Sequence, residues 1–251
     1  GVLIGVVLVA KHGAKAMSDP QRAQALLNAF DANTLAAGIF GSVTTLVVVS
    51  IASFREPGKT YAERLSFVPV DPKLTVLAVL VGLGCSELAA LALDQAQLYE
   101  GSNLEQLVDV FHSAGFGEFL VLTAAAGLAG VAEELVFRGQ FQPRLRQRWG
   151  KTPAIVVTAL LFGVMHMDPT HSLFAFIFGL YLGWIFEATG SLLTPIAVHV
   201  VNNLFASLGP RYLSEDTQGL AVAVVLTVGI GAALLLRKEL SRVATDSAVT
   251  Q

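Results

Sequence analysis

Residues 117–138 read GEFLVLTAAAGLAGVAEELVFR. The stretch is long and apolar enough to cross a bilayer as a helix, because a crossing needs about 20 mostly apolar residues. It nevertheless carries Glu133, Glu134 and Arg138 near its end. An ionisable side chain at membrane depth costs about 2.5–3.5 kcal/mol on insertion scales, so such residues are rare there and usually functional. The stretch therefore predicts a membrane helix that bears a polar site.

The whole chain has the composition of a protein with several membrane helices. Of its 251 residues, 54% are hydrophobic and 14% are charged, whereas soluble domains carry about 25% charged residues. We predict an all-α, polytopic transmembrane bundle of about seven or eight helices, forming a single membrane domain over residues 1–251. The candidate spans are 34–54, 74–93, 117–138, 153–167, 172–188, 191–208 and 219–236, with a shorter apolar fragment at 1–10.

Charge and cysteine content exclude several classes of protein. The net charge is −3, and no basic cluster is interleaved with aromatic residues, so no nucleic-acid partner is expected. The single cysteine, Cys85, excludes intrachain disulfides and a cysteine-rich metal site. The expected partners are membrane lipid, a protein or peptide substrate, and further membrane proteins.

The distribution of lysine and arginine predicts how the chain is oriented. Basic residues cluster in the connections 55–73 and 144–151 and after the last helix, at 237–242. The connection 94–116 carries acidic residues and no lysine or arginine. Since basic loops stay in the cytoplasm, we expect an integral protein of the bacterial inner membrane with a cytoplasmic C-terminus. Residues 11–33 depart from the pattern, because alternation puts their three basic residues outside.

Two further spans carry polar residues at helical spacing. Phe162 and His166 are four residues apart, as are His199 and Asn203, with Asn202 near the same face. If the cytoplasmic boundary lies near the basic connection 144–151, Glu133, His166 and Asn203 lie roughly 20 Å deep at 1.5 Å per residue, and His199 lies one turn shallower. We therefore predict one polar layer inside the membrane. His12, His112 and His171 fall in predicted connections and are expected to be solvated.

Helical spacing separates the two glutamates. Glu134 and Arg138 are four residues apart and can pair on one face. Glu133 and Arg138 are five residues apart and lie about 140° from each other around the helix. Glu134 therefore has a structural partner, and Glu133 is left for chemistry.

This set of residues suits hydrolysis by a general base. Glu133 and His166 could hold and deprotonate a water, and His199 and Asn203 could stabilise the oxyanion of a tetrahedral intermediate. An alternative uses Zn²⁺, held by Glu133, His166 and His199 with a bound water. We favour the route without a cofactor.

Two other functional classes remain open at this point. One is a non-catalytic scaffold or immunity-type membrane protein that retains the polar site. The other, less favoured, is a proton-coupled transporter, since buried glutamate and histidine can relay protons. The polar motifs occur once and not in two repeated halves, which argues against a transporter.

The motifs together resemble a known family. The sequence contains EELVFRG at 133–139, FGVMH at 162–166, GLYLG at 179–183, TGSL at 189–192 and HVVNN at 199–203, in this order. They resemble the CPBP family (CAAX proteases and bacteriocin-processing enzymes, also called ABI), which is related to the type II CAAX prenyl endopeptidases. The resemblance covers residues 116–208 as a catalytic core.

The resemblance implies an all-helical intramembrane endopeptidase with a cavity that is reachable from the cytoplasm. It implies that Glu133 and His166 activate water and that His199 and Asn203 surround the oxyanion. Glu134, Arg138, Phe162 and Asn202 are the expected supporting residues. Both a metalloprotease and a glutamate-dependent mechanism are compatible with the resemblance, and it does not supply the substrate.

Overall fold

The regular structure of the protein is entirely helical in the computed structural model, which describes residues 32–53, 65–212 and 215–249. The elements are α4 (Ala32–Ser53), α6 (Pro72–Gln95), α7 (Asn103–Ser113), α8 (Phe116–Val136), the π-helical turn η1 (Phe137–Phe141), α9 (Gln142–Trp149), α10 (Lys151–Val164), α11 (Pro169–Thr189), α12 (Leu193–Tyr212) and α13 (Glu215–Val249). Each of the seven spans predicted between residues 34 and 236 corresponds to a helix. The predicted fragment at 1–10 lies outside the described residues.

In the part of the chain that the structure describes, four helical segments are long and apolar enough to cross a membrane: Pro72–Gln95, Phe116–Trp149, Pro169–Thr189 and Gly219–Arg242. The apolar parts of α10 and α12 are shorter. Large apolar side chains point outward on α13, where Leu220, Ile230 and Leu234 are each about two-thirds exposed. Lipid would cover such a surface, and the chain is an integral membrane protein with an all-α fold.

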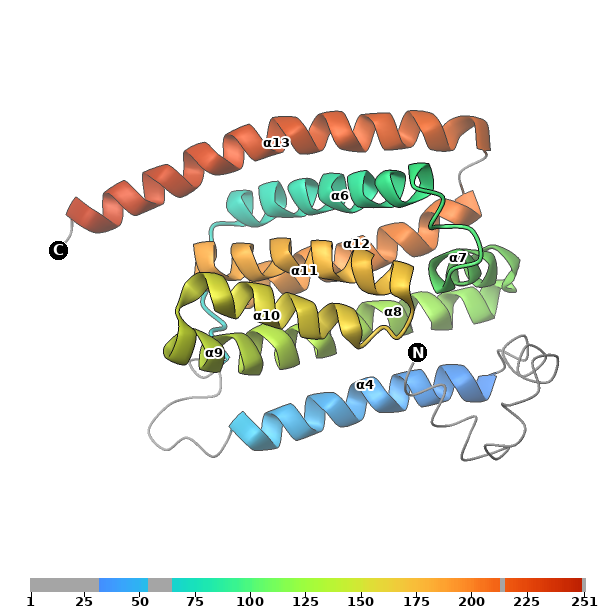
Figure 1. Cartoon of the computed structure of the whole chain (residues 1–251), viewed down its shortest axis with the longest axis horizontal. Coiled ribbons are helices and arrows are strands. Elements are labelled where there is room, and N and C mark those ends of the chain that lie inside the picture. The colour runs from blue at the N-terminus through green and yellow to red at the C-terminus, as the bar shows by residue number, and fades with distance from the viewer. Residues whose placement is uncertain (1–31, 54–64, 213–214, 250–251) are drawn as a thin grey trace.

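The core lies where four helices meet. Leu77 and Ala78 of α6 pack with Leu182 of α11, Val198 of α12 and Leu236 of α13. Figure 1 shows α13 lying along α6 on one side of the bundle, and α4 on the opposite side, next to α8. Helices α10 and α11 run side by side between these layers.

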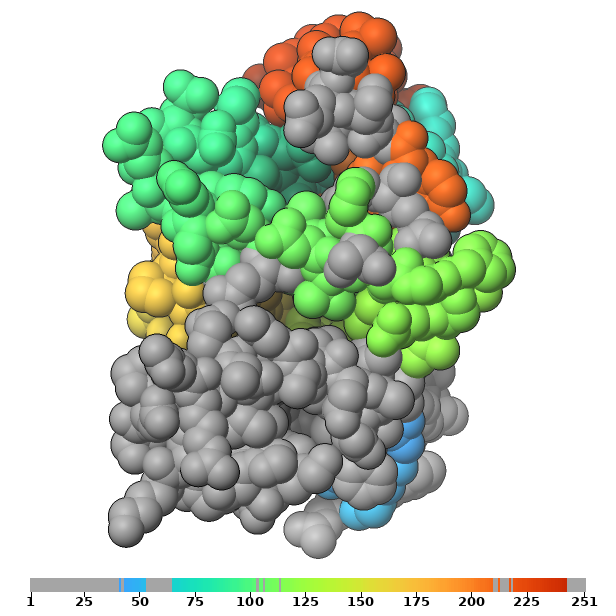
Figure 2. Space-filling view, turned by 90° about the vertical axis from the view of Figure 1, so that its right-hand side faces the viewer, coloured from blue at the N-terminus to red at the C-terminus, as the bar shows by residue number. Residues whose placement is uncertain are grey.

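The two ends of the bundle differ in charge. The turn at α9, the start of α6 and the end of α13 share one end, at the left of Figure 1. This end carries the basic residues Lys73, Arg144, Arg146, Arg148, Lys151, Arg237, Lys238 and Arg242. Helix α7 lies at the other end, together with the acidic connection around it. Figure 2 looks at that other end, where α7 and α8 lie between α6 and α4.

Helix α7 was not predicted, because its 11 residues are too few to span a membrane. Its N-terminus has a capping signal, Ser102 followed three residues later by Glu105. The Ser102 side chain accepts a hydrogen bond from the Glu105 N–H, and the Glu105 carboxylate accepts one from the Gly101 N–H. The predicted connection 94–116 therefore contains a helix that is capped at its N-terminus by Ser102.

The helix that carries Glu133 continues through η1 to Trp149, as the predicted polar layer requires. In η1 the Gln142 N–H donates to the Phe137 carbonyl, five residues back. Pro143 follows directly and has no N–H to donate, which disfavours a regular α-helical turn here. The helix accommodates the proline by widening into the π-helical turn just before it.

Helices α6 and α13 touch through glycines. A Cβ built on Gly229 would lie 3.0 Å from the Gly84 Cα and 3.2 Å from the Leu80 carbonyl oxygen. Both neighbours are backbone atoms, so neither can rotate away. Small residues at such positions allow close approach of helices in membranes.

We expect Gly229→Ala to destabilise the protein by about 1–3 kcal/mol, because the added methyl group overpacks the contact. The matched control is Gly231→Ala on the same helix, where a Cβ would meet no described atom within 4 Å. This control should keep or raise the melting temperature, since alanine favours a helix over glycine by up to about 1 kcal/mol. Equal melting temperatures of the two variants in detergent would contradict the close contact.

Candidate active site

One cavity of about 740 Å³ contains the predicted polar layer. Glu133, His166, His199 and Asn203, predicted from three separate spans, all line it. The cavity extends from these residues past α11 to α7 and to the first residues of α13. It therefore reaches toward the acidic end of the bundle.

A fully buried ion pair lies directly behind the cavity. Arg138 Nη1 is 2.7 Å from Glu134 Oε1, and neither side chain is exposed. The second guanidinium nitrogen donates to the Gly179 carbonyl on α11 at 2.8 Å. The guanidinium also lies 5.0 Å from the centre of the Phe162 ring on α10. The predicted Glu134–Arg138 pair is thus present, and it connects three helical segments.

His199 lies between the two glutamates. Its Nδ1 is 2.9 Å from Glu134 Oε1, and its Nε2 is 3.6 Å from Glu133 Oε2. Because an ionised carboxylate only accepts hydrogen bonds, the contact with Glu134 requires a proton on Nδ1. In the neutral ring Nε2 is then an acceptor, and it becomes a donor only when the ring carries both protons. The ring orientation is therefore fixed by Glu134.

The two glutamates differ in their surroundings. The Glu134 side chain is completely buried, whereas the Glu133 side chain is 33% exposed and faces the cavity. Only Glu133 is accessible to a molecule in the cavity. This difference agrees with the division of roles that the helical spacing predicts.

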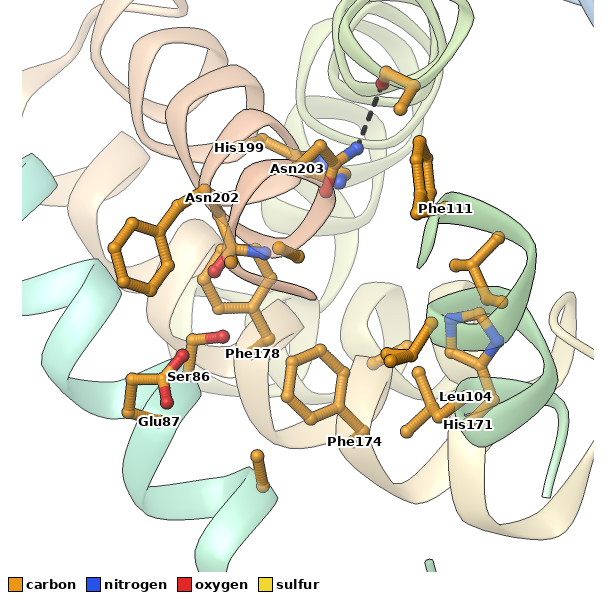
Figure 3. Close-up of a pocket in the computed structure, with 18 of the residues that line it drawn as sticks. Ser86, Glu87, Leu104, Phe111, His171, Phe174, Phe178, His199, Asn202 and Asn203 are labelled. Carbon is orange, nitrogen blue, oxygen red and sulfur yellow. Dashed lines mark hydrogen bonds between the residues drawn. The ribbon is translucent and has the colours of Figure 1, made fainter. Parts of the chain in front are cut away.

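Asn203 lies one turn beyond His199 and bonds across to α8. Its Nδ2 donates to the Ala126 carbonyl at 3.0 Å, which is the dashed line in Figure 3. The amide has two N–H groups, so one remains for a ligand in the cavity. A Cβ on Gly130 of α8 would lie 3.4 Å from both His199 and Asn203. Helix α8 therefore packs close to both polar residues at Gly130.

His166 lies at the end of α10, next to the Phe162 ring. The two rings meet edge to face at 5.1 Å, and His166 Nδ1 is 2.9 Å from the Phe162 carbonyl oxygen. A carbonyl oxygen only accepts, so Nδ1 is the donor and Nε2 of the neutral ring can accept a hydrogen bond. His166 can thus bind a water molecule as an acceptor.

The prediction that His171 is solvated was wrong. Asp168 caps α11 by accepting from the His171 N–H at 2.7 Å, so α11 begins earlier than expected and includes His171. The His171 ring lies 4.2 Å from the His166 ring and lines the cavity. His112 is exposed, and His12 lies outside the described residues.

The predicted metal ligands do not form an assembled site. Within the described ranges, no three histidine, cysteine, aspartate or glutamate side chains come together in a way that could hold a metal ion. Glu133 approaches His199, and His166 packs against Phe162 and His171. No step below is therefore routed through Zn²⁺.

Gln142 is a buried polar residue that the motifs did not single out. Its side chain is fully buried and donates to the Gly183 carbonyl at 3.0 Å and to Glu187 at 3.1 Å. Glu187 also pairs with Arg146 at 3.2 Å. The only signal in the sequence was the four-residue spacing that Gln142 shares with Arg138 and Arg146.

Arg138→Ala should destabilise the protein by about 3–5 kcal/mol, because it leaves Glu134 buried without a counter-charge. The control is Arg242→Ala, which removes an exposed pair with Glu239 and should cost no more than about 1 kcal/mol. Thermal unfolding in detergent measures both. A melting temperature for Arg138→Ala close to that of Arg242→Ala would contradict the structural role of the buried pair.

Comparison with known proteins agrees with the resemblance. Residues 115–205 match the family model described as type II CAAX prenyl endopeptidase Rce1-like, and this stretch contains every polar motif described above. No curated protein and no solved structure matches the chain. The resemblance seen in the sequence is thus confirmed over this stretch, where the chain is similar to the Rce1-like family.

Proposed function

We propose that this protein is an intramembrane endopeptidase of the CAAX-protease type. It hydrolyses peptide bonds in membrane-associated or membrane-proximal substrates by means of water activated at Glu133. The observation that carries the proposal is the position of Glu133: partly exposed in the cavity, beside His199, with its neighbour Glu134 already paired.

In this mechanism a water molecule lies between Glu133 and His166. The Glu133 carboxylate takes a proton as the water oxygen attacks the scissile carbonyl carbon, and the His166 Nε2 accepts the second hydrogen bond of the water. The proton held by Glu133 then passes to the leaving amine as the C–N bond breaks. General acid–base catalysis of this kind contributes about 10²–10⁴ in rate.

The oxyanion of the tetrahedral intermediate is stabilised from α12. The second N–H of Asn203 is available for this, since the first bonds to Ala126. His199 Nε2 joins it as a donor when the ring carries both protons. One such donor is worth about 10²–10³ in rate.

Glu133→Gln is expected to lower peptide cleavage by at least about 10²-fold, because the amide cannot take the proton from water. Folding should be retained, since Glu133 is not part of the buried ion pair. The assay incubates purified protein with a diverse pool of membrane-proximal peptides and reads the cuts by mass spectrometry. Glu118→Gln, an exposed glutamate on the same helix, is the matched control and should cut like the wild type.

Two further outcomes of this assay separate the competing hypotheses. Equal cleavage by wild type and Glu133→Gln would contradict the role of Glu133. Cleavage by neither, with both proteins folded, would favour the scaffold hypothesis. Bound metal is quantified in the same samples, and a chelator such as 1,10-phenanthroline should leave the rate unchanged if Glu133 acts without metal.

The side from which substrate enters is a separate question. The charge rule puts the basic end, with the C-terminus, in the cytoplasm, whereas the cavity extends toward the acidic end. The resemblance implies cytoplasmic access, so the two expectations assign opposite sides. We propose that the charge rule holds for this chain and that the cavity is reached from the non-cytoplasmic side.

Cysteine labelling in intact cells tests this orientation. In a Cys85→Ala background, Leu107→Cys on α7 should react with a membrane-impermeant maleimide. Lys151→Cys at the basic end should react only after the cells are opened, and both residues are exposed in the structure. The reverse labelling pattern would put the cavity on the cytoplasmic side and overturn the proposed orientation.

A further inference from the structure

A second polar group lies in the wall of the cavity, apart from the predicted catalytic residues. It consists of Ser86 and Glu87 on α6 and Asn202 on α12. Figure 3 shows all three on the same side of the cavity, with the Asn202 amide directed toward Ser86 and Glu87. Phe178 lies beside them and packs its ring against His199. We call Ser86, Glu87 and Asn202 the α6 subsite.

The polar groups of the α6 subsite lack partners in the described part of the protein. Ser86 and Asn202 are each only 6% exposed, and Glu87 is partly buried. None of the three has a hydrogen bond or an ion pair with another described residue. Buried polar side chains are nearly always hydrogen-bonded. Because Ser86 and Asn202 have no such partner, their polar atoms are left to bond to a molecule inside the cavity that they line.

The chemistry of the α6 subsite selects a cation. A carboxylate, a hydroxyl and an amide oxygen together accept hydrogen bonds and supply a negative charge. The neighbouring wall is apolar, with Ala90, Leu91 and Phe174. A cation in such surroundings needs a charged partner to offset its lost hydration. Lysine and arginine side chains fit, because each carries several N–H donors on an apolar stem.

The charged residues in the cavity wall are negative, like the α6 subsite. No lysine or arginine is among the described residues that line it, whereas Glu87, Asp94 and Glu133 are acidic. Glu87 and Asp94 are seven residues apart on α6 and lie on one face, with Asp94 near the C-terminal end of the helix. Burial raises the pKa of Tyr99 near that end, and nearby carboxylates, Glu105 first, raise it further. A basic residue of a substrate would be attracted to this acidic face of α6.

The position of Asn202 relates the α6 subsite to the bond that is cut. Asn202 follows His199 by three residues, which is less than one helical turn of about 5.4 Å. An extended peptide advances about 3.3 Å per residue. A side chain bound at the α6 subsite would therefore belong to a residue within about one or two positions of the scissile bond.

We propose that Ser86, Glu87 and Asn202 form a specificity subsite for a lysine or arginine side chain of the substrate, close to the cleaved bond and next to an apolar segment. This inference rests on the proposed endopeptidase function. It adds a substrate class, namely hydrophobic peptides that carry a basic residue beside the cleavage site.

The test compares matched peptides that wild type cleaves, with lysine or the uncharged isostere norleucine at one position near the cut. All peptides are acetylated and amidated, so the side chain is the only cation. The ratio of kcat/KM for lysine over norleucine should be at least about tenfold in wild type and should fall to near one in Glu87→Gln. Glu100→Gln is the control, an exposed glutamate outside the cavity lining, and it should keep the wild-type ratio.

A charge reversal gives a second readout. Glu87→Lys should prefer glutamate over lysine at the same peptide position. A wild-type ratio near one, or a ratio that survives Glu87→Gln, would overturn the α6 subsite and leave the endopeptidase function standing.

A binding measurement keeps the inference testable without cleavage. Fluorescent lysine and norleucine peptides are titrated onto Glu133→Gln and onto the Glu133→Gln, Glu87→Gln double variant. The lysine peptide should bind at least about tenfold more weakly to the double variant, while the norleucine peptide changes little. Equal loss for both peptides would point to a folding defect at α6 and would overturn the subsite. Absence of cleavage by wild type, with this binding pattern present, would contradict the proposed function alone.

Discussion

The buried ion pair between Arg138 and Glu134 is the interaction on which the candidate site depends. A carboxylate with no exposed surface requires a counter-charge, and Arg138 is the group that supplies it. The same guanidinium contacts the Gly179 carbonyl on α11 and the Phe162 ring on α10. The Glu134 oxygen that it holds is also the oxygen that orients His199 on α12. One pair of opposite charges thus fixes the positions of four helices and the direction of one imidazole ring.

Two adjacent glutamates acquire different tasks from this arrangement. Helical geometry directs the Glu134 side chain toward the protein interior and the Glu133 side chain toward the cavity. The exposed fractions of the two side chains differ accordingly. Paired carboxylates with unlike surroundings are a common way to obtain unlike chemistry from one residue type. His199 touches both, so it links the structural carboxylate to the one that faces substrate.

Local patterns in the sequence predicted much of this. Long apolar runs gave the spans, and four-residue spacing gave the pairs Glu134–Arg138 and Phe162–His166. The contact between His199 and Glu134 joins residues 65 positions apart, and no local pattern contains that information. Helix α7 was missed because it is amphipathic and short. The apolar pattern predicts His171 in a connection, because it does not reveal that Asp168 caps α11 and starts the helix earlier.

The sequence patterns also do not predict which polar residues outside the motifs are buried. Gln142 and Ser86 look unremarkable in the sequence, and their burial follows from how α9 packs on α11 and how α6 faces the cavity. Such positions depend on tertiary packing, which the period of a single helix does not describe.

The π-helical turn changes the direction in which the side chains of the long helix point before and after it. Before the turn, Glu133 and Glu134 face α12; after it, Gln142 and Arg146 face Gly183 and Glu187 on α11. One residue rotates an α-helix by about 100°, so deleting a residue between Phe137 and Phe141 would turn one of these two faces away from its partner. Substitutions in this segment should therefore be tolerated more readily than insertions or deletions. Its length sets the angle between the half of the helix that carries the chemistry and the half that anchors it.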